Sequence, residues 1–122
     1  MAGFTGFHNQ DLGRFGESKV AQYLINRKYQ ILDQNWRCQS GEIDLIAKSP
    51  AGTIVFVEVK TRRNSAFGHP LESIDSIKQS RLTRLARNWL RTKKLGAPTY
   101  RIDCAAVTLE PNLQIDYRIG VI

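Results

Sequence analysis

The segment over residues 54–61, Ile-Val-Phe-Val-Glu-Val-Lys-Thr, constrains the fold of this 122-residue chain more than any other feature. It is dense in β-branched residues, which are typical of strands. Successive side chains of a strand point to opposite faces, and therefore Glu58 and Lys60 share one face while the three valines share the other. The fold must accommodate a strand that presents a carboxylate and an ammonium group on the same side.

A second strand is predicted just before this one, over residues 42–48, with Ile43, Leu45 and Ala47 on one face. The intervening Ser-Pro-Ala-Gly sequence at residues 49–52 is typical of a turn. We therefore expect the two strands to form a hairpin.

The hydrophobic pattern also suggests the register of this hairpin, because pairing apolar residues across it buries the valine face consistently. The pairs are Ile43 with Val59 and Leu45 with Val57. The same register places Asp44 directly opposite Glu58. The two carboxylates are expected to lie together on one face of the sheet.

Two helices and five strands are predicted along the chain. The helices cover residues 9–28 and 73–94, and the strands cover residues 29–37, 42–48, 54–61, 99–109 and 112–118. The order α-β-β-β-α-β-β indicates an α/β fold with a mixed central β-sheet flanked by helices. With neither an internal repeat nor a linker, the chain is expected to form a single domain over residues 1–122.

The formal net charge of +7 favours encounters with polyanions such as nucleic acid or an anionic membrane. Basic residues cluster on the second predicted helix with no acid between them, at Lys78, Arg81, Arg84, Arg87, Arg91, Lys93 and Lys94. Such a run is either a solvated helix face or a surface for nucleic acid. The two cysteines have no metal-ligand spacing, and no apolar run approaches the roughly 20 residues that span a bilayer. A cytoplasmic protein without membrane contact is expected.

Two carboxylates about 5 Å apart between Cβ atoms repel each other, and something must compensate their charge. One alternative is an exposed ion-pair ladder in which Lys60 pairs with an acid. The other is a Mg²⁺ site, because this ion takes one or two carboxylates together with water. Ile46 and Phe56 share the face of Asp44 and Glu58, which suggests that this face is covered.

Several segments together resemble the YraN-like family of small bacterial proteins, in order along almost the whole chain. They are Gly16-Glu17, Asn35-Trp36-Arg37, residues 41–47, residues 56–62, Gly68-His69-Pro70 and Arg101-Ile102-Asp103. That family is similar to the PD-(D/E)xK nuclease superfamily, which includes restriction endonucleases, Holliday-junction resolvases and tRNA-splicing endonuclease domains. The resemblance implies a restriction-endonuclease-like fold.

The resemblance also implies roles for individual residues. Asp44 and Glu58 match the two acidic metal ligands, joined by the backbone carbonyl of Val59, and Lys60 matches the lysine that orients or activates the attacking water. The ion would be Mg²⁺ or Mn²⁺. Glu17 matches an acid on the first helix that adds to the metal site in resolvase-like members. Ile43 stands where the superfamily motif often has proline, a departure that many members share.

Five basic residues are predicted to contact the nucleic-acid backbone: Arg62, Arg63, Lys78, Arg81 and Arg84. Helical spacing places Lys78 between Ile74 and Leu82, on the side of the helix that faces the protein. It either contacts a phosphate near the metal site or extends its ammonium group from the edge of the core.

The function expected from the sequence is that of a metal-dependent endonuclease acting on structured or branched nucleic acid, with DNA favoured over RNA. The alternative is a module on the same fold that binds nucleic acid or a partner protein without cutting. Resolvase-like members work as homodimers, because cutting two strands needs two sites, and a homodimer is expected here as well.

Overall fold

The structure is a computed structural model, and it describes residues 9–64, 75–96 and 98–122. Its elements are α1 (Asn9–Asn26), β1 (Gln30–Cys38), β2 (Gly41–Lys48), β3 (Ile54–Arg62), α2 (Ser76–Thr92), β4 (Tyr100–Thr108) and β5 (Gln114–Arg118). The predicted order of helices and strands is confirmed, with boundaries that differ by at most three residues. The predicted start of the second helix at residues 73–74 and the Gly68-His69-Pro70 segment lie outside the described residues.

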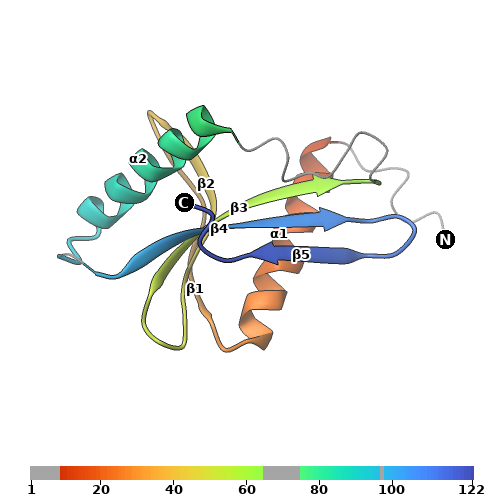
Figure 1. Cartoon of the computed structure of the whole chain (residues 1–122), viewed down its shortest axis with the longest axis horizontal. Helices are drawn as coiled ribbons and strands as arrows, with labels where there is room; N and C mark the ends of the chain where they lie inside the picture. Colours follow the sequence, from red (N-terminus) through yellow and green to blue (C-terminus); the bar gives the residue numbers. More distant parts are fainter. Residues whose placement is uncertain (1–8, 65–74, 97) are drawn as a thin grey trace.

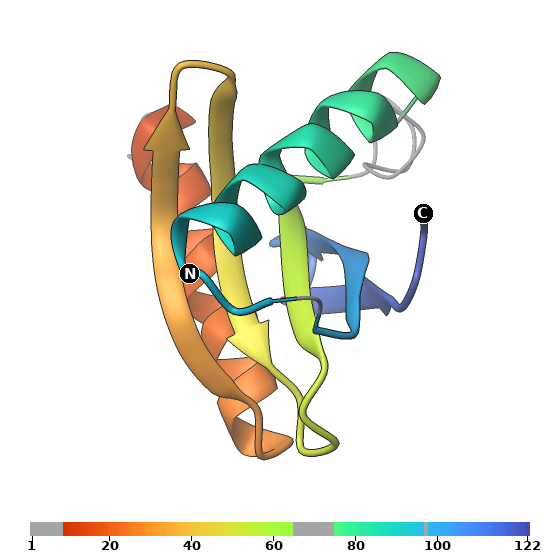
Figure 2. The ribbon, with the colours of Figure 1, turned by 90° about the vertical axis from the view of Figure 1, so that its left-hand side faces the viewer.

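The sheet has the order β1-β2-β3-β4-β5. β3 and β4 run parallel, whereas the other neighbouring strands are antiparallel, so that the predicted mixed sheet is confirmed. α1 covers one face of the sheet and α2 crosses the other (Figures 1 and 2). The α/β architecture with flanking helices therefore agrees with the expectation from the sequence.

The core forms two clusters, one on each face of the sheet. On the α1 side, Val20 and Leu24 pack against the valines of β3. On the α2 side, Leu85 and Trp89 pack against Phe56. Lys60 does pair with Glu58, as the ion-pair alternative predicted, but Glu58 is buried, so that this pair is not an exposed ladder.

The predicted register of the β2–β3 hairpin is confirmed over four pairs, from Lys48↔Ile54 to Leu45↔Val57. The predicted continuation to Ile43↔Val59 is not among the pairs of this ladder. Ile43 was expected on the same face as Leu45, but it packs in the cluster under α2 whereas Leu45 packs under α1. Since residues two apart on a regular strand share a face, β2 changes face around Asp44.

Asp103 ties the last part of the chain to the centre of the sheet. It is fully buried on β4 and accepts hydrogen bonds from Arg101 Nε at 3.0 Å, from the Tyr117 hydroxyl at 2.6 Å and from the backbone N–H of Gly120 at 2.8 Å. The Arg101 guanidinium also donates to the Tyr29 hydroxyl at 2.7 Å. One buried carboxylate thereby joins β4, β5 and the residues that follow β5.

Gly16 of α1 packs directly against Thr61 of β3. A Cβ atom added there would overlap the Thr61 side chain, whereas one added at Gly13, a turn earlier on the same helix, would meet nothing within 4 Å. We expect Gly16→Ala to lower the free energy of unfolding by about 2 kcal/mol, because overpacking forces α1 away from the sheet. Gly13→Ala should raise it by up to about 1 kcal/mol, since alanine favours helix. Urea unfolding measures the free energy of unfolding of both variants. Equal changes in the two variants would contradict the close packing at Gly16.

Candidate metal and nucleic-acid site

Asp44 lies just beyond the last residue pair of the β2–β3 ladder. Its Oδ2 accepts a hydrogen bond from the backbone N–H of Val59 at 2.8 Å. In a continued antiparallel ladder this N–H would bond to a backbone carbonyl of β2. The Asp44 carboxylate takes the place of that carbonyl, and its side chain is therefore directed at β3 and not straight out of the sheet face as predicted.

The surroundings of Asp44 disfavour its charged form. Burial, followed by the nearby charge of Glu58, raises the pKa of Asp44 to about 8, although the hydrogen bond from Val59 acts in the opposite direction. Glu17 and Glu42 raise this pKa further through their charges. Asp44 is thus a partly desolvated acid in a region of negative potential.

Glu58 is buried on β3, with 8% of its surface exposed. Burial raises its pKa, while the positive charges of Lys60, Lys78 and Arg81 lower it. Lys60 Nζ lies 3.6 Å from Glu58 Oε1, which confirms that these two side chains share a face and come together. The acid therefore lies among three basic groups from two different elements.

Lys78 and Arg81 come to this site from the first turns of α2. Asp75 caps the helix by accepting a hydrogen bond from the Lys78 backbone N–H at 2.9 Å. Lys78 is a close neighbour of Lys60. Burial, followed by the contact with Lys60 and its positive charge, lowers the pKa of Lys78. The prediction that Lys78 lies on the side of the helix facing the protein is confirmed, since its charge acts on Glu58 and the residue is half-buried, whereas its contact with a phosphate stays a prediction.

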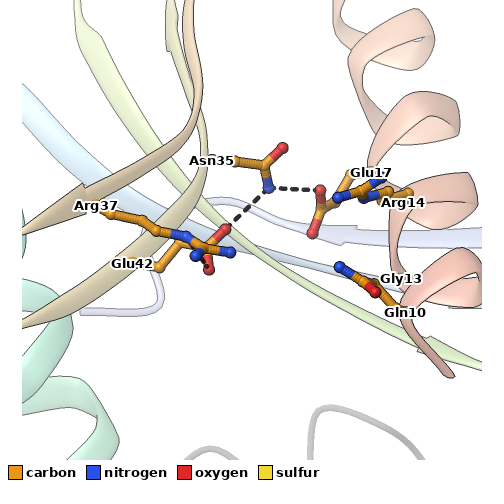
Figure 3. A pocket seen from close by; sticks show the side chains of 7 residues that line it. All are labelled: Gln10, Gly13, Arg14, Glu17, Asn35, Arg37 and Glu42. Carbon is orange, nitrogen blue, oxygen red and sulfur yellow. Dashed lines mark hydrogen bonds and ion pairs between the residues drawn. The ribbon is translucent and has the colours of Figure 1, made fainter.

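Glu17 of α1 and Glu42 of β2 form a second acidic pair, shown in Figure 3. Asn35 of β1 joins them, since its Nδ2 donates to Glu17 Oε1 at 2.8 Å and to Glu42 Oε1 at 3.0 Å. Arg37 Nε approaches the other oxygen of Glu42 at 3.4 Å. These side chains line a hollow of about 300 Å³ beside α1, together with Gln10, Gly13 and Arg14. Glu17 acts on Asp44 through its charge, but its hydrogen bond goes to Asn35 of β1, and its contribution to the metal site stays a prediction.

The predicted arginine contacts are distributed over two areas. Arg62 is exposed and Arg63 half-buried at the end of β3, whereas Arg84 is exposed on α2. Arg84 lines a hollow of about 360 Å³ with Arg87, Arg91, Asn88 and Ser40. The hollow lies where the turn between β1 and β2 meets α2, and no acid lines it. Arg84, Arg87 and Arg91 therefore form a basic surface on α2, whereas Lys78 and Arg81 lie near Glu58.

Three residues of this site were not predicted. Glu42 could have been found from its position two residues before Asp44. Asn35 belongs to the Asn35-Trp36-Arg37 segment of the family resemblance, but its type and position in a strand do not indicate a contact with Glu17 and Glu42. Cys104 pairs with Glu58 across β3 and β4, and burial together with the charge of Glu58 raises the pKa of its thiol to about 12. A thiol of this kind stays protonated and unreactive.

Asp44 and Glu58 fit a divalent cation as a pair. Both carboxylates are desolvated, and the charge of Glu58 disfavours ionisation of Asp44, which a cation between them would relieve. Within the described residues no three acids, histidines or cysteines are grouped closely enough to hold a metal ion. Two carboxylates with water still satisfy Mg²⁺, and Val59 as a further ligand stays a prediction.

Comparison with known proteins gives the family of the chain. The model of a family described as "Uncharacterised protein family UPF0102" matches residues 16–107. The chain belongs to the UPF0102 family. The match begins within α1, spans α2 and most of the sheet, and confirms the YraN-like family named from the sequence motifs.

Relatives within the UPF0102 family are similar over most of their length. A protein of Paenarthrobacter aurescens is 45% identical over 84% of this chain and 88% of its own length. One of Clavibacter michiganensis is 49% identical over 80% of this chain and 82% of its own. A relative from Syntrophus aciditrophicus is 44% identical over 88% of this chain and 84% of its own length.

Solved structures resemble this family member only distantly. The EndoMS–dsDNA2 complex has a TM-score of 0.45 and 14% identity, over 80% of this chain and 38% of that chain. A repair endonuclease from Pyrococcus abyssi has a TM-score of 0.41 and 15% identity, over 77% of this chain and 39% of that chain. This chain spans about two fifths of the length of each of these two proteins.

In the part of the chain that the structure describes, neither helix has the length and apolar character needed to cross a membrane.

Proposed function

We propose that this UPF0102 protein is a divalent-metal-dependent endonuclease that hydrolyses phosphodiester bonds of structured or branched nucleic acid, with DNA favoured over RNA. The observation that carries the proposal is the meeting of two desolvated carboxylates, Asp44 and Glu58, with the ammonium groups of Lys60 and Lys78. A purely structural ion pair needs one acid and one base. An arrangement of two acids and several bases, partly buried, is instead typical of a site that handles a charged ligand.

Asp44 and Glu58 would hold Mg²⁺ or Mn²⁺, with the backbone carbonyl of Val59 as a further oxygen ligand. Such an ion supplies neutralisation of the negative charge that develops on the phosphate oxygens during hydrolysis. The hydrogen bond from Val59 uses one oxygen of Asp44 and fixes the orientation of that carboxylate, leaving the other oxygen for a ligand.

Lys60 would orient the water that attacks phosphorus, as the P–O bond to the leaving sugar oxygen breaks. Its position within 3.6 Å of Glu58 places an ammonium group next to the acid pair. Lys78 and Arg81 come from α2, and they would bind the non-bridging oxygens of the same phosphate. Their charges would both attract the substrate and stabilise the transition state.

The nucleic acid would follow the basic surface of α2 away from this site. From Lys78 to Arg91 the helix rises by about 20 Å, at 1.5 Å per residue, which corresponds to several phosphates of a strand. The hollow lined by Arg84, Arg87 and Arg91 would hold a phosphate at the far end. Arg62 and Arg63 would contact the backbone on the other side of the cut, and a homodimer would supply a second site for the second strand.

Cleavage of labelled duplexes, junctions, flaps and RNAs with Mn²⁺, Mg²⁺ or a chelator tests the proposal. We expect metal-dependent cutting that Glu58→Gln reduces by about 10²–10³-fold, because the variant loses a charge that holds the cation. Asp116→Asn, at an exposed acid of a similar ion pair on β5, should cut at the wild-type rate.

The same substrates reveal the alternative function in a gel-shift measurement. Binding that weakens with salt, without cutting under any of these conditions, would replace the nuclease by a module that only binds nucleic acid. The ion pair between Lys60 and Glu58 is the observation that favours this alternative, since it partly compensates the acid without a metal. If the protein neither cuts nor binds these substrates, both the nuclease and the nucleic-acid-binding function would be contradicted.

A further inference from the structure

Asn35 links two elements that both carry an acid close to Asp44. Its single side-chain nitrogen donates to Glu17 of α1 and to Glu42 of β2, at 2.8 and 3.0 Å. Figure 3 shows the amide between the two carboxylates, with Arg37 next to Glu42. Without a donor between them, two carboxylates that both reach the same amide nitrogen would repel each other. Asn35 is therefore the group that allows Glu17 and Glu42 to stay together.

The backbone of Asn35 is unusual at the same place. Its φ of 50° lies in the left-handed region, which residues with a Cβ atom rarely adopt. In the β1–β2 ladder, Gln34 pairs with Leu45 and Trp36 pairs with Ile43, and Asn35 is thereby level with Asp44. The left-handed residue of β1 and the change of face in β2 occur at the same level of the sheet.

The residue type follows from these two requirements together. Glycine, asparagine and aspartate tolerate a left-handed conformation best. Glycine has no side chain to bridge the acids, and aspartate would add a third negative charge and no donor. Among these residues only asparagine combines the conformation with two N–H bonds for two carboxylates.

The two acids held by Asn35 act on Asp44 through their charges, and within the described residues they do not form a three-ligand metal group with it. We propose that Asn35 is a positioning residue that fixes Glu17 and Glu42 as an outer layer of negative charge around the cation held by Asp44 and Glu58. This inference rests on the proposed metal site. Residues behind the direct ligands of a metal commonly change its affinity by 10–100-fold when they are replaced.

Mn²⁺ binding to the full chain, followed by electron paramagnetic resonance without nucleic acid, tests the role of Asn35. We expect Asn35→Gly to weaken Mn²⁺ binding about tenfold, because the backbone conformation is kept while Glu17 is no longer tied to β2. The unfolding temperature of the metal-free variant should stay close to that of the wild type. A loss of Mn²⁺ affinity that follows only from a loss of fold would overturn the inference.

A double-mutant cycle with Glu17→Gln shows whether Asn35 acts through Glu17. In the Glu17→Gln background, Asn35→Gly should weaken Mn²⁺ binding much less than tenfold, since the acid that it positions is already neutral. Equal losses in both backgrounds would overturn the positioning role.

Asn35→Asp gives an independent readout in the metal-free protein. Three carboxylates would then meet without a donor, and the variant should unfold at lower temperature in low salt and recover in high salt, where charges are screened. An unfolding temperature that salt does not change relative to wild type would contradict the bridging role.

The failure of this inference differs from the failure of the proposed function. If the wild type binds no Mn²⁺, the proposed metal site itself fails. If the wild type binds Mn²⁺, Glu58→Gln abolishes the binding and Asn35→Gly leaves it unchanged, the metal site stands and the role of Asn35 is overturned.

Discussion

Replacing Asp44 with asparagine is expected to stabilise the metal-free protein at pH 7 by about 2 to 4 kcal/mol. Burial and the charge of Glu58 raise the pKa of Asp44 from its ordinary value of 3.8 to about 8. The folded protein therefore binds the Asp44 proton more tightly than the unfolded chain does. Asparagine has the same shape, keeps an oxygen that can accept from the Val59 N–H, and carries no charge to desolvate.

The sign of the pH dependence follows from this shift. An acid whose pKa is raised on folding contributes its full stability below its unfolded pKa and loses that stability as the pH rises toward its folded pKa. The wild type should therefore lose stability between about pH 4 and pH 8 relative to Asp44→Asn, and the two should converge at pH 4. Urea unfolding at several pH values with a chelator present measures the difference. A variant less stable than wild type at pH 7 would contradict the unfavourable burial of this charge.

Addition of Mn²⁺ should reverse the order of stability. A ligand that binds only the folded state stabilises it by mass action. The wild type should gain stability with Mn²⁺ concentration, whereas Asp44→Asn should not, because it lacks a charged ligand. A gain of equal size in both proteins would place the cation elsewhere.

Replacing Asp103 with asparagine is expected to lower the free energy of unfolding by about 3 kcal/mol or more. Asp103 is fully buried and accepts hydrogen bonds from Arg101, Tyr117 and Gly120. Removing its charge leaves the Arg101 guanidinium without its acid partner. The amide would also set its own N–H donors against those of its neighbours.

Urea unfolding of Asp103→Asn and Asp116→Asn compares two Asp–Arg pairs with the same spacing along neighbouring strands. The pair of Asp116 with Arg118 is as short as 2.8 Å, but it is exposed, and its loss should leave the free energy of unfolding nearly unchanged. If Asp103→Asn does not fold, Tyr117→Phe offers a milder change, with an expected loss of about 1 kcal/mol from one hydrogen bond. Similar effects at Asp103 and Asp116 would show that burial does not strengthen the pair.

These two predictions have opposite signs because the two acids are satisfied differently. Asp103 has three donors around it, one of which is the Arg101 cation, whereas Asp44 has one backbone donor and three acids nearby. A buried acid with partners stabilises the fold, and a buried acid among acids stores unfavourable free energy that a cation can release. The contrast between them supports a structural role for Asp103 and a binding role for Asp44.

Much of the fold could be predicted because it follows from local periodicity. The run of β-branched residues at 54–61, the alternation in residues 42–48 and the turn between them specify the hairpin and its register from Leu45 to Lys48. The pairing of Glu58 with Lys60 follows from the two-residue period of a strand alone. The prediction failed at Ile43, where β2 changes face, because alternation assumes that a strand stays regular.

The chain itself determines that a buried strand carries Glu58 and Lys60 on one face, and that Asp44 comes from the strand before it. Only the tertiary structure decides how Asp44 is directed, since this depends on a left-handed residue in β1 and on a backbone N–H in β3. It also decides that Glu17, Glu42, Lys78 and Arg81 surround the two acids. The physical reason is that strand periodicity acts between neighbours in sequence, whereas desolvation and charge act between groups that folding brings together from distant segments.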